Sequence, residues 1–210
     1  GRSPRGDDEG EARLTVALLD YGINNLHSIR RALESLGATV EVQTVFEPRD
    51  KLVIPGVGAF GAAMTELAPS VERIREYARG GGPTMGVCLG QQLLFERSEE
   101  HGTAVEGLGL VPGAVRYLPR DRGVKVPHMG WTPLTWSRRD GLGDGLADGE
   151  AVYFVHSLAC EPTDPAVTVA TAEHGGAVCA AVQAGSVWGT QFHPEKSGEV
   201  GRRILANFLK

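Results

Sequence analysis

The sequence predicts an α/β fold in which a central, mostly parallel sheet is flanked by helices and extended by antiparallel strands in its second half. The first observation is the run at residues 14–20 (LTVALLD), whose nearly unbroken apolar character is typical of a strand buried on both faces. The second is that such runs alternate with segments of helical periodicity as far as residue 98, as expected where helices cross over between parallel strands. The third is that the rest of the chain holds short β-like runs separated by Gly, Pro and Asp, a pattern typical of antiparallel strands.

After its first strand, the first half of the chain is expected to contain three helices and three further strands. A helix is expected at residues 24–36, because leucine and isoleucine recur there at helical spacing and Gly37 provides a C-terminal stop. Pro69 favours the first turn of another helix, which the glycines at 80–82 end. Strands are expected at 39–45, 51–54 and 84–87, and helices at 69–78 and 89–98.

The second half carries its β-like runs within residues 105–136 and 151–192. The runs at 167–171, 177–182 and 187–191 are expected to be successive antiparallel neighbours. A final amphipathic helix is expected at 199–209, with Val200, Ile204 and Phe208 on one face.

Composition and charge limit the classes of protein to which the chain can belong. Residues 13–210 are long enough for one domain, whereas the polar and aperiodic residues 1–12 (GRSPRGDDEGEA) are expected to be a disordered leader or an expression remnant. The 21 basic and 26 acidic side chains give a net charge of −5, which offers no basic track for nucleic acid. No apolar run reaches the roughly 18 residues that span a bilayer, and no signal-peptide core is present. A cytoplasmic protein without a membrane partner is expected.

The three cysteines, Cys88, Cys160 and Cys179, are odd in number and far apart, which excludes a disulfide framework and a zinc site of the CxxC type. Cys160 and Cys179 lie in apolar strand-like runs and are expected to be buried. The histidines show no HExxH or paired spacing, so no metal is expected, and residues such as His128 and His156 are assigned to the surface, to caps or to the hydrogen-bonded core. No GxGxxG is expected to open a helix after a strand, and no P-loop occurs, so no cofactor is expected.

The strongest local signal is GVCLG (residues 86–90), between an expected strand and an apolar helix. It has the form of a nucleophile elbow with Cys88 as the nucleophile, because a sharp strand-to-helix turn strains the central residue and leaves room only for glycine around it. The N–H groups that begin the following helix would favour a thiolate and face an oxyanion. The alternative is a buried structural cysteine beside a glycine turn.

A second signal is QFHPE (residues 191–195) at the end of an expected strand. Residues two apart in an extended segment project to the same side, so Glu195 can orient His193 and stabilise its charged form. With Cys88 they would complete a Cys-His-Glu triad for acyl transfer. The alternative is a surface histidine at a strand-end turn.

The third signal is PGVG (residues 55–58), directly after the strand expected at 51–54. Glycines on both sides of Val57 would let a peptide turn its N–H toward the active centre, as an oxyanion hole requires. The alternative is an ordinary turn at the exit of a strand.

Taken together, PGVGAF, GVCLGQQLLFE and QFHPEKSG, in this order, resemble the class I glutamine amidotransferases of the triad type, over residues 14–210. DYGINNLHSIRRAL, SEEHG, EGLGLVPG, VPHMGW, YFVHS and HPEKSG are more particular, and they resemble the glutaminase subunits of imidazole glycerol phosphate synthases, from histidine biosynthesis. The resemblance implies a flavodoxin-like amidotransferase fold and hydrolysis of L-glutamine to glutamate and ammonia through a cysteine thioester.

The same resemblance assigns roles to matching positions. Cys88 is the nucleophile, His193 its base and later acid, and Glu195 the group that orients the imidazole. The backbone N–H of Leu89 and one from the loop at 56–58 form the oxyanion hole. The remaining candidates are the oxyanion-loop residues Gly56, Val57 and Gly58 and the substrate-binding residues Gln92, Glu100, Ser157 and Leu158.

The resemblance also implies a heterodimer with a (β/α)8 cyclase subunit, which receives the ammonia through a channel. There the ammonia would meet a phosphoribulosyl formimino intermediate and yield imidazole glycerol phosphate and an aminoimidazole carboxamide ribotide. Asn25, Trp131 and Lys196 match positions at the subunit interface. An oxyanion loop that stays inactive until the partner binds is also implied.

Four positions depart from the family pattern, namely Asn24, Gln91, Thr132 and Leu158. None belongs to the triad, but Leu158 adjoins the glutamine pocket, and Asn24 and Thr132 lie near partner-facing motifs. These departures leave room for a glutaminase paralogue that supplies ammonia to a different synthase, or for altered coupling to the partner. An alternative of another class is a catalytically silent subunit that only binds a partner.

Overall fold

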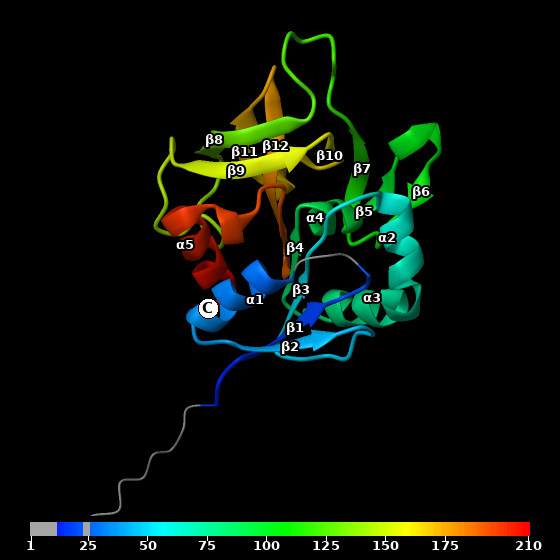
Figure 1. The fold of residues 1–210 in the computed structure, drawn as a ribbon, viewed down its shortest axis with the longest axis vertical. Coiled ribbons are helices and arrows are strands. Elements are labelled where there is room, and N and C mark those ends of the chain that lie inside the picture. The colour runs from blue at the N-terminus through cyan, green and yellow to red at the C-terminus, as the bar shows by residue number, and fades with distance from the viewer. Residues whose placement is uncertain (1–11, 23–25) are drawn as a thin grey trace, which may run out of the picture.

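The larger sheet changes from parallel to antiparallel part-way across. The computed structural model describes residues 12–22 and 26–210, and within them nine strands pair in the order β2-β1-β3-β4-β13-β12-β11-β8-β9 (Figure 1). The parallel strands are β1 (Thr15–Leu19), β2 (Thr39–Gln43), β3 (Lys51–Ile54), β4 (Thr84–Val87) and β13 (Val187–Thr190). The antiparallel strands are β12 (Ala177–Ala184), β11 (Thr168–Glu173), β8 (His128–Trp136) and β9 (Ala151–His156). The expected parallel sheet with an antiparallel extension is confirmed.

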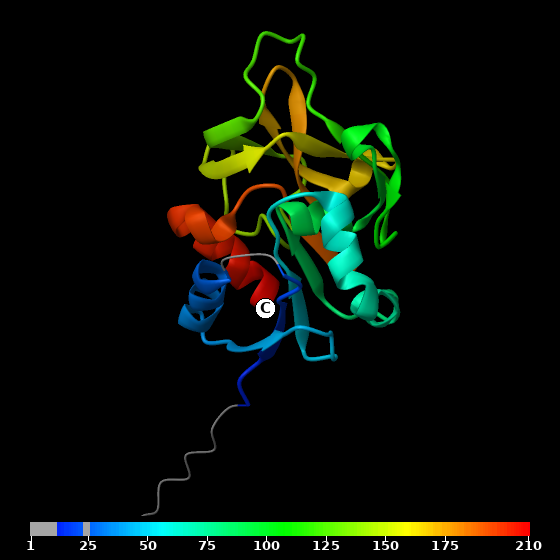
Figure 2. The same ribbon diagram turned by 45° about the vertical axis from the view of Figure 1, so that its right-hand side comes forward.

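Helices cover both faces of the parallel part, which gives three layers (Figures 1 and 2). Helices α1 (His27–Ser35) and α5 (Gly198–Leu209) lie on one face, and α2 (Phe60–Leu67) and α3 (Val71–Arg79) lie on the other. Strand β1 contributes to both layers, because Leu18 shares a core with Ile29 of α1, whereas Leu19 shares the opposite core with Phe60 of α2. This two-sided burial is the reason for the unbroken apolar run that predicts the parallel sheet.

A smaller sheet lies next to the antiparallel part, and its described strands have the order β10-β7-β5-β6. The chain passes from the larger to the smaller sheet between β9 and β10, which places Ser157 and Leu158 at the junction of the two sheets. The strands are β5 (Phe95–Ser98), β6 (Val105–Glu106), β7 (Val111–Tyr117) and β10 (Leu158–Pro162). Short 3₁₀ turns are η1 (Ala68–Ser70), η2 (Glu100–Gly102), η3 (Pro165–Val167) and η4 (Pro194–Lys196).

The prediction of a helix at residues 89–98 is wrong for its second half. Helix α4 (Leu89–Leu93) has 5 residues, and the chain then continues as β5. The carbonyl of Leu94 accepts backbone hydrogen bonds from Leu110 and Val111 at 2.8 and 3.0 Å, and β5 pairs with β6 and β7. These partners come from later in the chain, whereas an unbroken apolar stretch by itself is compatible with a buried helix or a buried strand.

The other expected elements differ less. The helix expected at 69–78 is α3, preceded by η1, and the final helix is α5 with Ile204 and Phe208 buried. The helix expected at 24–36 is α1, and Asn24 and Asn25 lie outside the described residues. Residues 1–11 of the expected leader also lie outside them. No described helix is long and apolar enough to cross a membrane.

Helix α2 has no counterpart among the expected elements, because GAAMTEL offers few large apolar residues from which to read a period. The expectation that no GxGxxG opens a helix after a strand is wrong, because GVGAFG (residues 56–61) follows β3 and opens α2. The pattern does not have the close packing of a nucleotide-binding turn, because a Cβ on Gly61 would meet Val105 at an ordinary 3.8 Å. The N–H of Phe60, at the start of α2, already donates to the carboxylate of Glu100 at 2.8 Å.

Candidate active site

Cys88 stands on a sharp turn between β4 and α4, with φ at +56° and ψ at −113°. Non-glycine residues rarely adopt such backbone angles, which cost about 1–3 kcal/mol. The flanking glycines permit the turn. A Cβ on Gly86 would lie 2.3 Å from the carbonyl oxygen of Gly90, and a Cβ on Gly90 would lie 1.8 Å from that of Ile54. The expected elbow geometry is therefore present.

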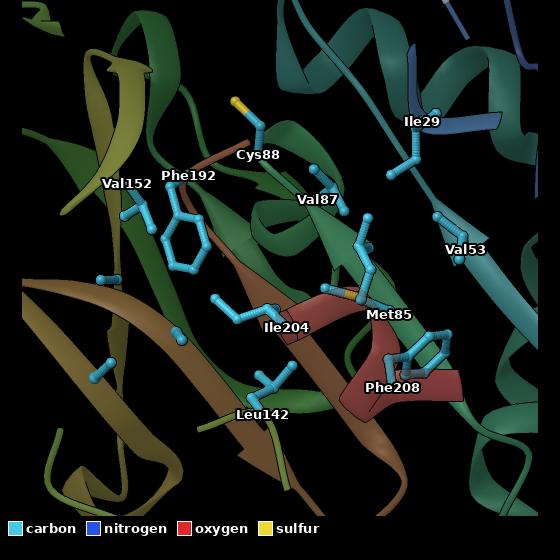
Figure 3. Close-up of a cluster of buried hydrophobic side chains, with 14 of the residues drawn as sticks. Ile29, Val53, Met85, Val87, Cys88, Leu142, Val152, Phe192, Ile204 and Phe208 are labelled. Atoms are coloured by element: carbon cyan, nitrogen blue, oxygen red, sulfur yellow. The ribbon is translucent and has the colours of Figure 1, made fainter. Parts of the chain in front are cut away.

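The sulfur of Cys88 is directed away from the labelled apolar side chains around it (Figure 3). Its thiol donates to the carbonyl of Val155 at 3.9 Å, and the sulfur accepts from Nε2 of Gln191 at 3.8 Å. The other two cysteines, Cys160 and Cys179, are free and buried, as expected, and burial raises the pKa of both thiols, to about 11 for Cys179. Cys88 is thus the cysteine that faces a cavity.

His193 and Glu195 form a buried pair. Nδ1 of His193 lies 2.7 Å from Oε1 of Glu195, and the two side chains are 5% and 8% exposed. Burial lowers the pKa of His193, but its interactions with Cys88 and Glu195 outweigh burial and raise that pKa to about 9. Within the described part of the chain, Nε2 of His193 is buried without a regular hydrogen bond, so it is free to exchange a proton.

The loop at residues 55–58 closes over one side of Cys88. The N–H of Leu89, an expected oxyanion donor, donates to the carbonyl of Gly56 at 3.3 Å, so it is already engaged. The hydroxyl of Tyr21 donates to the carbonyl of Pro55, and a Cβ on Gly56 would lie 2.4 Å from that hydroxyl. Gly58 has φ at +106°, which favours glycine. Tyr21 therefore holds the loop through the carbonyl of Pro55, and the carbonyl of Gly56 occupies the N–H of Leu89.

A cavity of about 370 Å³ brings together the expected substrate residues and all the expected oxyanion residues except Gly56, which lines a second cavity. Glu100 is held there through the N–H of Phe60, and Gln92 through the carbonyl of Leu158, which accepts from its Nε2 at 3.2 Å. The expected residues that line it are Val57, Gly58, Cys88, Leu89, Gln92, Glu100, Ser157 and Leu158, and they are joined by Pro127, Val155 and His156.

A second cavity, of about 240 Å³, lies on the other side of the oxyanion loop. Val57 lines both cavities, and His193, Glu195 and Lys196 line the second. Val57 therefore lies between the two cavities, and the His193–Glu195 pair lines only the second. Among the described residues, no group of three or more His, Cys, Asp or Glu side chains is arranged to hold a metal ion.

Two of the expected interface residues lie near each other. Trp131 on β8 is 58% exposed, and its ring centroid lies 6.1 Å from that of Tyr153 on β9. The N–H of Tyr153 donates to Ser197 at 3.0 Å, directly after the exposed Lys196 of η4. Met129, two residues before Trp131, is 62% exposed, which extends an apolar surface along β8. The third expected residue, Asn25, lies outside the described residues.

Three features of the site are absent from the sequence-based expectations: the contact of Tyr21 with Pro55, that of Gln191 with Cys88, and the presence of His156 in the cavity wall. The period of a strand offers a signal for Gln191, because it stands two residues before His193. No local signal marks Tyr21, whose partner is 34 residues away.

The family comparison covers the same region of the chain. The model described as glutamine amidotransferase class-I matches residues 17–210, which include all the candidate catalytic positions. The chain belongs to the class I glutamine amidotransferase family. The expectation of an amidotransferase is thereby confirmed.

Two relatives of this amidotransferase are the imidazole glycerol phosphate synthase subunits HisH of Syntrophotalea carbinolica and Natronomonas pharaonis, each 45% identical to it. The first match covers 92% of this chain and 98% of the relative, and the second covers 96% and 97%. The structure of PurLQS from Thermotoga maritima matches with a TM-score of 0.69 at 21% identity, over 94% of this chain and 98% of that one. At this identity the likeness concerns the fold alone, and the expected amidotransferase fold is confirmed.

Proposed function

We propose that this amidotransferase is the glutaminase subunit of an imidazole glycerol phosphate synthase and hydrolyses L-glutamine through a thioester on Cys88. The observation that carries the proposal is one cavity in which Cys88 lies beside Gln92 and Glu100. The His193–Glu195 pair, whose imidazole interacts with Cys88, supplies a base whose pKa these neighbours raise. A nucleophile, an oriented base and a pocket of the right polarity are the parts that acyl transfer needs.

In the reaction, Nε2 of His193 takes the proton of the Cys88 thiol, and the thiolate attacks the side-chain amide carbon of glutamine. The C–N bond breaks as the imidazolium returns its proton to the nitrogen, so ammonia leaves and the γ-glutamyl thioester remains. Water then attacks the thioester with His193 as its base, the C–S bond breaks, and the thiol recovers its proton as glutamate leaves. The raised pKa of His193 favours the imidazolium that the first step produces.

The cavity residues divide the recognition of glutamine between charge and hydrogen bonding. The carboxylate of Glu100, 15% exposed, supplies a negative charge for the α-amino group. The backbone at Ser157 supplies polar contacts for the α-carboxylate, and the Oε1 of Gln92 is an acceptor for the α-amino group, because both hydrogens of the Gln92 NH₂ group are already donated. Leu158 closes the apolar side of the pocket.

The oxyanion loop is the proposed point of control. The Leu89 N–H must leave the carbonyl of Gly56 before it can stabilise an oxyanion, and a turn of the peptides around Val57 would release it. One backbone hydrogen bond of 3.3 Å has a net worth of about 0.5–1.5 kcal/mol, so the energy of binding a partner is enough to shift the loop.

The proposed partner is the (β/α)8 cyclase subunit. An exposed Trp131 next to Met129 is the kind of aromatic anchor that protein interfaces use, and Lys196 adds a charge near it. Ammonia released at Cys88 would pass beside Val57 into the second cavity and on to the partner. A cytoplasmic location is proposed with it, consistent with three free cysteines.

The test of the nucleophile is Cys88→Ala, assayed by glutamate release in the presence of the cyclase subunit. We expect a loss of about 10⁴-fold or more, because the variant cannot form the thioester. Cys179→Ala is the matched control, since it removes a buried thiol that lines no active-site cavity. Glutamate release by Cys88→Ala at the parental rate would falsify the assignment.

The test of the partner is co-purification from the native host followed by assay with and without the protein recovered. We expect a cyclase subunit and slow hydrolysis by the isolated chain that rises strongly when the cyclase and its nucleotide ligand are added. Recovery of a different synthase would favour the paralogue. Equal rates with and without the partner would contradict control through the loop, and no hydrolysis in either case would favour the silent subunit.

A further inference from the structure

The side chain of Gln191 joins the nucleophile to the glutamine pocket. It is fully buried directly after β13, and its backbone N–H donates to Ala180 at 2.8 Å, which fixes the residue to β12. Its Nε2 lies 3.8 Å from the sulfur of Cys88, and its Oε1 accepts from Nε2 of Gln92 at 3.1 Å.

The orientation of the Gln191 amide is determined by its neighbours. The carbonyl of Leu158 can only accept, so Gln92 must present its NH₂ group to it, at 3.2 Å. The same NH₂ group has its second hydrogen for Gln191, which must therefore present its oxygen to Gln92. The NH₂ group of Gln191 then faces Cys88, because the reversed amide would set two donors against each other.

The Leu158 carbonyl is itself held by a chain of buried hydrogen bonds. It accepts from Nδ1 of His156 at 2.7 Å, and Nε2 of His156 lies 2.9 Å from Nδ1 of His128. Nε2 of His128 lies 2.8 Å from the hydroxyl of Thr132 on β8. Burial lowers the pKa of both histidines to about 4, so each is neutral at pH 7 and every donor in the chain meets an acceptor. The Gln191 amide is anchored through this chain to the outer strands of the sheet.

We propose that Gln191 is a further catalytic residue: its amide N–H stabilises the Cys88 thiolate and keeps the sulfur aimed into the pocket. When the thiol loses its proton, it also loses its donation to the carbonyl of Val155, and that oxygen then repels the thiolate. The N–H of Gln191 becomes the neutral donor to the charged sulfur, beside the imidazolium of His193. The short α4, with 5 residues, offers less help from its dipole than the expected ten-residue helix would.

The test is the pH dependence of Cys88 alkylation by iodoacetamide, followed by mass spectrometry of the peptide that contains Cys88. In Gln191→Met, we expect the profile to move to higher pH by about one unit or more and kcat with the cyclase to fall about tenfold to a hundredfold, with little change in KM. Gln183→Met is the matched control. Gln183 is also buried and bonds Leu142 and Asp140 through its amide, away from the site, so its profile should equal that of the parent.

A second variant covers the case in which Gln191→Met does not fold. Gln191→Glu keeps the size and the acceptor for Gln92 but replaces the donor by a carboxylate oxygen, so the alkylation profile should move up by at least as much. Profiles that coincide with the parental one in the folded variants would overturn the proposal, whatever happens to kcat. The inference rests on Cys88 as the nucleophile, yet alkylation needs no glutamine, so its failure and that of the proposed hydrolysis are separate results.

Discussion

The two sides of the active site differ in how firmly they are built. On the nucleophile side, Cys88 is fixed by a strained turn between glycines without room for a Cβ, and His193 is buried against Glu195 at 2.7 Å. On the oxyanion side, Val57 is 48% exposed and a Cβ on Gly58 would meet open space. The groups proposed to perform proton transfer and attack are therefore assembled in advance, whereas the group proposed to stabilise the developing charge is not.

Under the proposed mechanism, this difference means that the change with the lower energetic cost, in the loop at residues 55–58, is the one that a partner would control. Rebuilding the elbow would require moving backbone atoms that are in van der Waals contact, since Gly90 already touches the carbonyl of Ile54. Opening the oxyanion hole requires only two hydrogen bonds to break, one from the Leu89 N–H to Gly56 and one from the Tyr21 hydroxyl to Pro55. A partner that binds the outer surface can supply the second change but not the first.

The largest expected effect comes from a substitution on the nucleophile side, at Glu195. Glu195→Gln removes the charge that holds His193, and we expect kcat with the cyclase to fall by about 10²–10⁴-fold, because the imidazole loses both its orientation and its support. The pKa of His193 is about 9 in the parent, so parental activity should decline above that pH as the acid for the leaving ammonia is lost. Removing a carboxylate that raises this pKa should move the alkaline limb to lower pH.

The control for this variant is Glu199→Gln, which removes an exposed carboxylate four residues later in the first turn of α5. It should keep the parental rate and pH profile. An alkaline limb at the same pH in Glu195→Gln and the parent would show that Glu195 does not set the protonation of His193.

Sequence patterns predict the nucleophile side well because its geometry depends on residues that are close in the sequence. The elbow lies within five consecutive residues, and the His193–Glu195 pair lies within three, so spacing alone is enough to place them. Pairing rules also predict the parallel strands and the antiparallel succession from β11 to β13. The assembly of Gln92, Glu100 and Ser157 around Cys88 follows from resemblance, not from spacing.

The remainder depends on contacts between distant parts of the chain. Phe95–Ser98 becomes a strand because β6 and β7 offer it partners, which no periodicity in 89–98 records. The engagement of the Leu89 N–H by Gly56 joins residues 33 positions apart, and the anchor of Tyr21 on Pro55 joins residues 34 positions apart. A sequence pattern can identify such residues as donors, but the fold decides which acceptor each one meets.

The smallest expected effect concerns the oxyanion side, and it distinguishes the two sides most clearly. Tyr21→Phe removes the hydroxyl that holds the Pro55 carbonyl in the state where Leu89 is blocked. We expect hydrolysis by the isolated chain to rise about twofold to tenfold while the rate with the cyclase stays unchanged, so the ratio of activation falls. Tyr77→Phe is the control, because its hydroxyl donates to the carbonyls of Arg49 and Asp50 far from the loop. If Tyr21→Phe instead lowered both rates equally, Tyr21 would be supporting the active loop, and the blocked state would owe its stability to the Leu89–Gly56 bond alone.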